Sequence, residues 1–202
     1  MLYHILSNLF NILLRSFYTL EIRGFDDLPD TASIVAPNHA SFLDPPLVSL
    51  AYPSHLHFFA RKSLFQNKLF AYVLKKLNAH PIGPGAEGLR ALAQARKLLN
   101  DNQTVVLFPE GTRSEDGALL PLKKGVVNLS FKSNVPITPM FIHGAHEVWP
   151  RGNILPRVGG KITLTFCKPL YPSSYAHLPT QEATEQMLTD LQNTLHGVSS
   201  RS

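Results

Sequence analysis

The sequence predicts an α/β fold, a single domain with a central, largely parallel or mixed sheet flanked by helices. Short runs rich in β-branched residues alternate with longer segments in which apolar residues recur at helical spacing. The 202 residues suit one domain with a sizeable core. No internal repeat or low-complexity tract divides the chain.

Taken in order, strands are expected where short apolar runs are bounded by turn residues or proline, at 20–24, 32–36, 57–60, 80–82, 104–108, 137–142 and 161–166. Helices are expected where apolar residues recur every three or four positions, at 44–52, 63–77, 88–100, 124–132 and 180–196. The first of these helices has a well-marked start, because Asp44 can cap it and Pro45 fits its first turn. Because strands and helices alternate, neighbouring strands are predicted to run parallel.

The N-terminal segment carries apolar side chains at helical spacing, namely Leu2, Ile5, Leu6, Leu9, Leu13 and Phe17. It is shorter than the roughly 20 apolar residues that span a bilayer, and it lacks the basic start of a signal peptide. Two interpretations stay open, an amphipathic helix on a membrane surface or a helix packed on the domain's own core. We divide the chain into a membrane-associating helix at 1–19, a main domain at 20–196 and a frayed tail at 197–202.

The composition favours anionic partners. The formal net charge is +5, yet only 16% of residues are charged and 44% are hydrophobic, so part of the surface is expected to face lipid or a partner. The basic clusters at 61–62, 75–76 and 123–124 suit phosphate esters or an anionic membrane. No nucleic-acid partner is expected, because no recognised binding module accompanies these charges. The single cysteine, Cys167, excludes an internal disulfide.

The segment Asn38–Pro45 holds a histidine and a carboxylate five positions apart, His39 and Asp44. On one continuous helix they would point in different directions, but the prolines place Asp44 at a helix start and His39 in the loop before it. The loop can then fold the carboxylate onto the imidazole, which orients the ring and leaves its other nitrogen free to accept a proton. The alternative is that Asp44 only caps the helix and His39 only bonds the loop.

The segment Phe108–Ser114 follows a predicted buried strand, at the sheet edge where α/β proteins bind ligands. Gly111 allows close backbone approach, Thr112 offers a hydroxyl, and Arg113 offers a planar fork suited to phosphate. Glu110 can accept hydrogen bonds from a polyol. The alternative is a polar turn with an exposed Glu–Arg pair.

Together with Val135–Pro139 (VPITP), the NHASFLD and FPEGTRS segments resemble three of the four blocks of the 1-acylglycerol-3-phosphate acyltransferase family, in the glycerolipid acyltransferase superfamily. The resemblance covers about residues 20–170 and implies a glycerol-3-phosphate acyltransferase-like fold. It implies that His39 and Asp44 form the catalytic pair, that Glu110–Arg113 (Glu110, Gly111, Thr112 and Arg113) bind the acceptor, and that Val135–Pro139 shapes the acyl-donor site. It further implies acyl-CoA or acyl-carrier protein as donor, with no cofactor and no metal.

One block departs from the family. An arginine usually follows a strand near residues 80–85, as a ligand of the acceptor phosphate, but this chain reads AHPIGPG at 79–85. We expect Arg61, Lys62 or Lys124 to take the phosphate instead, or the acceptor to differ from a simple glycerol phosphate.

The expected function is therefore transfer of a fatty acyl group from a thioester to the free hydroxyl of a lysophospholipid, most simply 1-acylglycerol-3-phosphate. The expected place is the cytosolic face of the cell membrane, on an anionic lipid surface. A lyso-aminolipid or another lysolipid acceptor, and a non-catalytic lipid-surface binding protein, are the alternatives. Direct transfer is expected because the chain has no G-x-S-x-G segment for an acyl-enzyme.

Three other patterns favour simpler interpretations. Residues 83–88 fit G-x-G-x-x-G, but the preceding strand is short and contains proline, so a dinucleotide site is not expected. The histidine pairs His55/His57 and His143/His146 lack further ligands at metal-site spacing. Cys167 continues a strand pattern and is expected in the core.

Overall fold

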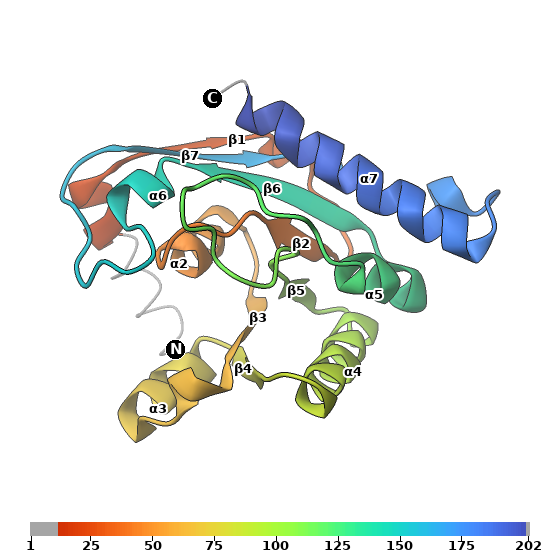
Figure 1. Ribbon diagram of the computed structural model, residues 1–202, viewed down its shortest axis with the longest axis horizontal. Coiled ribbons are helices and arrows are strands. Elements are labelled where there is room, and N and C mark those ends of the chain that lie inside the picture. The colour runs from red at the N-terminus through yellow and green to blue at the C-terminus, as the bar shows by residue number, and fades with distance from the viewer. Residues whose placement is uncertain (1–11, 201–202) are drawn as a thin grey trace.

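The computed structural model describes residues 12–200 and places seven strands in one sheet, in the order β1-β7-β6-β2-β5-β3-β4 (Figure 1). The strands are β1 (Thr19–Arg23), β2 (Ile34–Pro37), β3 (Leu56–Arg61), β4 (Ala79–Ile82), β5 (Thr104–Val106), β6 (Ile137–His143) and β7 (Lys161–Phe166). Only β6 and β7 pair antiparallel within the described residues. The predicted mixed, largely parallel α/β sheet is confirmed.

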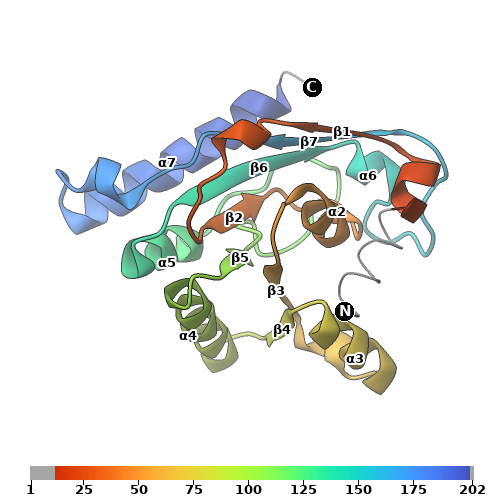
Figure 2. The ribbon, with the colours of Figure 1, turned by 180° about the vertical axis from the view of Figure 1, so that it is seen from behind.

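Helices cover both faces of this sheet. They are α2 (Asp44–Ala51), α3 (Lys68–Lys76), α4 (Ala86–Asn100), α5 (Gly125–Ser133), α6 (Ala145–Val148) and α7 (Thr180–Ser199), with 3-10 turns at Phe25–Asp27, Lys62–Phe65 and Pro172–Tyr175. The side chains of α4, α5 and α7 pack with Ile34 and Ile137, whereas those of α2 pack with Val35 and Met140. Figure 2, seen from behind, shows α2 on the face opposite α7. Alternate strand residues therefore supply two separate cores.

The predicted helix at 63–77 is wrong in its extent, because the segment divides into a 3-10 turn at Lys62–Phe65 and α3 at Lys68–Lys76. The Asn67 side chain accepts a hydrogen bond from the backbone N–H of Leu69 (3.0 Å), which favours a new helix start there. The four-residue helix α6 was not predicted. Its apolar pattern is too short to see, and it begins after Gly144, whose φ of 83° ends β6 abruptly.

The N-terminal helix predicted from residue 2 lies partly outside the described residues, which begin at Ile12. Residues 12–17 are helical. Leu14 is buried in the core beside α2, whereas Ile12, Leu13 and Phe17 are exposed. The described part of this segment is therefore packed on the core through one face, and its contact with a membrane surface stays a prediction. Within residues 12–200, no helix combines the length and hydropathy needed to cross a bilayer.

The parallel strands bring their C-terminal ends to one edge of the sheet. β2 pairs with β5 on one side and with β6 on the other, all parallel. The His39 segment follows β2, the Glu110 segment follows β5, and Gly144 follows β6. Segments about 70 and 105 residues apart in sequence therefore meet at the edge where ligands bind in such sheets.

Candidate active site

His39 and Asp44 are in direct contact. His39 Nδ1 lies 2.7 Å from Asp44 Oδ2, and the same oxygen accepts the backbone N–H groups of Ala40 (2.8 Å) and Ser41 (2.7 Å). Asp44 is the first residue of α2 and is only 1% exposed, whereas 19% of the His39 side chain is exposed. The predicted fold-back of the loop is confirmed, and Asp44 holds both the loop and the ring. With Nδ1 bonded to the carboxylate, Nε2 is the nitrogen able to accept a proton.

The neighbouring loop supports the His39 ring and backbone. The Phe108 ring stacks on the imidazole, with centroids 4.0 Å apart. The His39 carbonyl accepts a hydrogen bond from the Ser114 N–H (2.8 Å). The loops after β2 and β5 are therefore joined directly, and the position of His39 depends on both.

Glu110 makes a second connection between the two loops. Its Oε1 accepts the backbone N–H of His39 (2.6 Å), and its Oε2 accepts the N–H of Leu120 (2.8 Å). The side chain is 2% exposed. Both oxygens are thus occupied by backbone donors beneath the loop, and we treat Glu110 as a positioning residue. Its direct contact with an acceptor stays a prediction of the family resemblance.

The pKa of Glu110 is raised from 4.5 to about 7, chiefly by burial and to a smaller extent by the nearby charge of Asp44, while hydrogen bonds from the backbone N–H groups of Leu120 and His39 oppose the rise. A folded-state pKa above the unfolded value means that this carboxyl group favours folding below about pH 4.5. Its contribution is lost as the pH rises through about 7.

We expect the variant Glu110→Gln to flatten the pH dependence of the free energy of unfolding between those two pH values, because an amide does not titrate. Urea unfolding at a series of pH values measures this. Glu182→Gln, at an exposed carboxylate on α7, is the matched control and should keep the wild-type curve. An unchanged slope in Glu110→Gln would show that Glu110 is ionised throughout.

The guanidinium groups of Arg113, Arg151 and Arg61 lie near one another and near Asp44. Arg113 lies over the Phe42 ring (3.6 Å to the centroid), and its Nη1 is buried with no hydrogen-bond partner among the described residues. Burial lowers the pKa of Arg113, and so do the charges of Arg151 and Arg61. Arg151 also donates to the Arg113 carbonyl (3.4 Å) and pairs with Glu115 (3.1 Å). Several cationic side chains around a donor that lacks a partner are typical of a site that binds an anion such as phosphate.

Sequence reasoning missed Arg151. It lies in an irregular loop that carries no motif, and only the folded chain brings it to Arg113.

Lys123 was also missed as a residue of the site. The backbone of Gly111 has φ 71°, which favours glycine. A Cβ built there would meet the side-chain end of Lys123, so Lys123 lies against the motif loop. The printed sequence offered only the basic pair 123–124 as a signal.

Two predicted lysines have other partners. Lys62 pairs with Glu87 of α4 (2.5 Å), and Lys124 pairs with Glu185 of α7 (3.2 Å). Both side chains are exposed, so their contribution to acceptor binding stays a prediction.

The predicted Thr112 is half-buried in the loop between Gly111 and Arg113. Val135–Pro139 leads into the N-terminal end of β6, in register with Ile34–Ala36, so it lies at the other end of the strand from the His39 loop. Its part in donor binding also stays a prediction.

β4 supplies no cation in place of the arginine usual in the family. His80 bonds to His57 (3.0 Å between Nε2 and Nδ1) and to Gln94 (2.7 Å), and burial lowers the pKa of both histidines. Burial therefore favours the neutral form of both rings. Within the described residues, no three His, Cys, Asp or Glu side chains cluster as metal ligands would. Burial raises the pKa of Cys167 to about 11, which keeps it a thiol.

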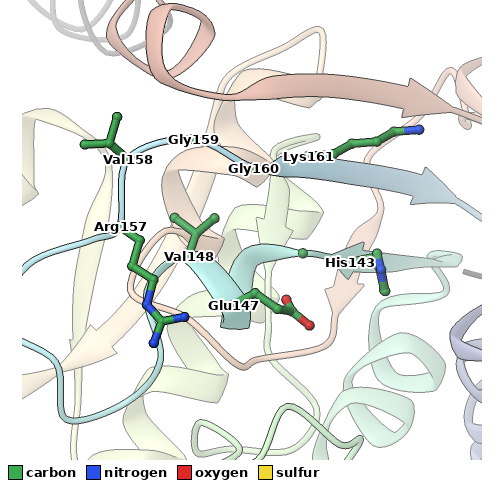
Figure 3. A pocket seen from close by; sticks show the side chains of 9 residues that line it. His143, Glu147, Val148, Arg157, Val158, Gly159, Gly160 and Lys161 are labelled. Atoms are coloured by element: carbon green, nitrogen blue, oxygen red, sulfur yellow. The ribbon is translucent and has the colours of Figure 1, made fainter.

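A cavity of about 380 Å³ lies along the same sheet edge, between α6 and the chain that enters β7. Figure 3 shows it between Glu147 and Val148 on α6 and the segment Arg157–Lys161. Neither His39 nor Asp44 lines it. The proton-accepting nitrogen of His39 therefore lies outside this cavity, and the two features are distinct.

The chain is similar to acyltransferases in both sequence and structure. A profile of the family described as Acyltransferase matches residues 19–143. The chain is 29% identical to the 1-acyl-sn-glycerol-3-phosphate acyltransferase of Bacillus subtilis, over 96% of this chain and 98% of that protein. It is 30% identical to a chloroplastic protein of the same enzyme name from Brassica napus, over 92% of this chain and 55% of that protein.

The crystal structure of the 1-acyl-sn-glycerophosphate acyltransferase PlsC from Thermotoga maritima superimposes with a TM-score of 0.81, at 24% identity, over 99% of this chain and 80% of that chain. This similarity confirms the fold. The family profile covers more than half of the chain and includes His39, Asp44 and Glu110–Arg113. The chain therefore belongs to the Acyltransferase family.

Proposed function

We propose that this protein transfers a fatty acyl group from an acyl thioester to the free hydroxyl of 1-acylglycerol-3-phosphate, with His39 as the general base. The 2.7 Å contact between His39 Nδ1 and Asp44 Oδ2, next to the cationic group of Arg113, carries the proposal. The enzyme names of the Bacillus subtilis and Brassica napus relatives support the acceptor. The cytosolic face of a membrane, where lysolipid and soluble thioester meet, is the proposed place of reaction.

The proposed reaction is a direct transfer. The acceptor hydroxyl gives its proton to His39 Nε2 as its oxygen attacks the thioester carbonyl carbon. The imidazolium that forms is stabilised by Asp44. The tetrahedral intermediate then expels the thiolate, and His39 returns the proton to that sulfur, so the base is regenerated.

The nucleophilic side chains near the site support direct transfer over an acyl-enzyme. Ser41 Oγ donates to the Trp149 carbonyl (2.9 Å), and Ser114 Oγ donates to Asp116 (2.9 Å). Both serines are buried. Cys167 is a buried thiol whose backbone N–H bonds to Pro139, toward the other end of β6 from the His39 loop. Hydroxylamine treatment of enzyme mixed with donor alone should release no acyl hydroxamate from protein, and a protein-bound acyl group would contradict the direct route.

Arg113, Arg61 and Arg151 are the proposed ligands of the acceptor phosphate, in place of the arginine absent near residue 82. Arg113 Nη1 is a buried donor without a partner among the described residues, and a phosphate oxygen would satisfy it. The planar guanidinium stacked on Phe42 is held in one orientation, which suits a forked contact with two phosphate oxygens.

We therefore expect Arg113→Ala to lower kcat/KM for 1-acylglycerol-3-phosphate by about 10- to 150-fold, equivalent to about 1.5–3 kcal/mol for hydrogen bonds to a charged group. The kcat/KM for 1-monoacylglycerol, which lacks the phosphate, should not fall. The assay is release of thiol with each acceptor, run with acyl-CoA and with acyl-carrier-protein donors. Arg96→Ala, at an exposed arginine on α4, is the control. Equal losses of kcat/KM with both acceptors would show that Arg113 does not bind the phosphate.

A further inference from the structure

The loop Trp149–Gly160 between α6 and β7 exposes three aliphatic side chains at its tip. Ile154 is 89% exposed, Leu155 is 76% exposed and Val158 is 79% exposed. Single exposed aliphatic residues are ordinary on a protein surface. Three within five positions form a concentrated apolar surface, which is typical of an interaction site.

The base of this loop is held firmly although its tip is free. The Arg157 N–H donates to the Val148 carbonyl (2.8 Å), and the Arg157 carbonyl accepts the Tyr18 hydroxyl (2.9 Å). The Trp149 indole N–H donates to the Asn153 carbonyl (2.9 Å). The exposure of the tip is therefore built into an anchored loop, and the same anchors fix its position relative to the rest of the domain.

The apolar tip belongs to a larger surface. Ser41, in the His39 loop, donates to the Trp149 carbonyl, and the Phe42 and Trp149 rings are in contact (5.3 Å between centroids). Figures 1 and 2 both show the loop beside residues 12–17, whose Ile12, Leu13 and Phe17 are exposed. Exposed apolar side chains thus lie along one end of the molecule, next to the segment that carries His39.

The loop Trp149–Gly160 itself is positively charged, because it contains Arg151 and Arg157 and no acidic residue. Arg157 lies two positions after Leu155 in the sequence. Figure 3 shows the side chains of Arg157 and Val158 pointing to opposite sides of the loop. Lys161 pairs with Glu21 (2.8 Å), whereas Arg157 makes no ion pair within the part of the chain that the structure describes. Aliphatic side chains bordered by an uncompensated arginine complement the acyl chains and phosphates of an anionic membrane.

We propose that Trp149–Gly160 is a membrane-docking loop, in which Ile154, Leu155 and Val158 enter the surface of an anionic bilayer and Arg157 binds lipid phosphates. The inference rests on the proposed function, which requires a bilayer. It adds that contact between this loop and the bilayer holds the His39 loop against the membrane surface. A lysolipid can then reach His39 without leaving the membrane surface.

The first test follows the tip directly. The variant Leu155→Cys, labelled with an environment-sensitive fluorophore, should show a blue shift and quenching by lipid-borne quenchers when phosphatidylcholine vesicles containing phosphatidylglycerol are added. The native Cys167 is buried and does not compete for label. Leu89→Cys is the control, since Leu89 is 71% exposed on α4. Helix α4 packs beside β4, and β4 and β1 are the two outermost strands on opposite sides of the sheet. A Leu155 probe that stays in water on bound protein overturns the proposal.

The second test measures vesicle partition of the full chain. The triple variant Ile154→Ser/Leu155→Ser/Val158→Ser should bind these vesicles about tenfold or more weakly, since each aliphatic side chain loses its burial in lipid. The single control Leu89→Ser should bind as the wild type does. Arg157→Gln should lose only the preference for phosphatidylglycerol. Unchanged partition of the triple variant overturns the proposal, and so does a change in its oligomeric state without vesicles, which would assign the surface to a second copy of the chain.

These outcomes are separate from those of the proposed function. A wild-type protein that docks through Leu155 but transfers no acyl group would refute the acyltransfer proposal alone. A triple variant that keeps activity on short-chain, monomeric lysolipid and loses it on vesicle-borne lysolipid would support both.

Discussion

Replacing His39 with alanine is expected to lower kcat for acyl transfer by about 10²–10⁴, because the variant lacks the proposed general base for the acceptor hydroxyl. The fold should remain, since Asp44 keeps its two hydrogen bonds to Ala40 and Ser41, and Glu110 keeps its bond to the backbone of residue 39. The loss should fall on kcat, because the guanidinium groups proposed to bind the acceptor are untouched. Steady-state thiol release and thermal unfolding measure the two effects.

His177→Ala is the control for this variant, because His177 is exposed near the start of α7 and far along the chain from the His39 loop. It should retain wild-type kcat. The general-base role would be refuted by a His39→Ala enzyme that turns over at the wild-type rate. Partial rescue by added imidazole would support that role, since the missing ring leaves a space beside Phe108.

Replacing Asp44 with asparagine should reduce kcat by a comparable factor, up to about 10⁴, through loss of charge alone. Asparagine keeps an oxygen in place of Oδ2, which can still accept from His39, Ala40 and Ser41. Its amide would occupy the place of Oδ1, which has no partner among residues 12–200. The ring keeps its orientation, but the imidazolium of the transition state loses its counter-charge. Kinetics with a fixed donor concentration measure the loss.

Asp44→Ala is the comparison that separates charge from structure. It removes the acceptor of two buried backbone N–H groups as well, and each costs about 1–3 kcal/mol of stability when left unbonded. We expect Asp44→Ala to melt well below Asp44→Asn. If Asp44→Asn retains full activity, the negative charge of Asp44 has no part in catalysis. Equal stability of the two variants would show that the bonds of Asp44 to Ala40 and Ser41 contribute little to folding.

The site depends on connections between two loops more than on any single motif. The His39 loop is bonded to the Phe108–Ser114 loop through Glu110 Oε1 and through the Ser114 N–H. Glu110 also reaches Leu120, so the long irregular segment after β5 is held in the same network. Variants at Glu110 therefore act on the position of His39, although Glu110 need not touch either substrate.

Most of the fold could be predicted from the sequence because its strands are marked by local composition. The predicted strands at 104–108 and 137–142 contain β-branched residues bounded by turns, and both are buried strands, although the first ends at Val106, two residues earlier than predicted. The helix at 44–51 begins where Asp44 and its prolines indicate. The break near Asn67 was missed because it depends on one side-chain hydrogen bond within a continuous apolar pattern.

The α/β class, the family and the two loops that carry the candidate chemistry can be predicted from the sequence, since each depends on residues close together along the chain. The contacts between distant segments could not be predicted: the bond from the His39 backbone to Glu110, the bond from Arg151 to Arg113, and the ion pairs of Lys62 and Lys124 appear only in the folded chain. The physical reason is distance along the chain. Such contacts join residues some 25 to 71 positions apart, and the order and direction of the strands, set by packing of both cores, bring them together.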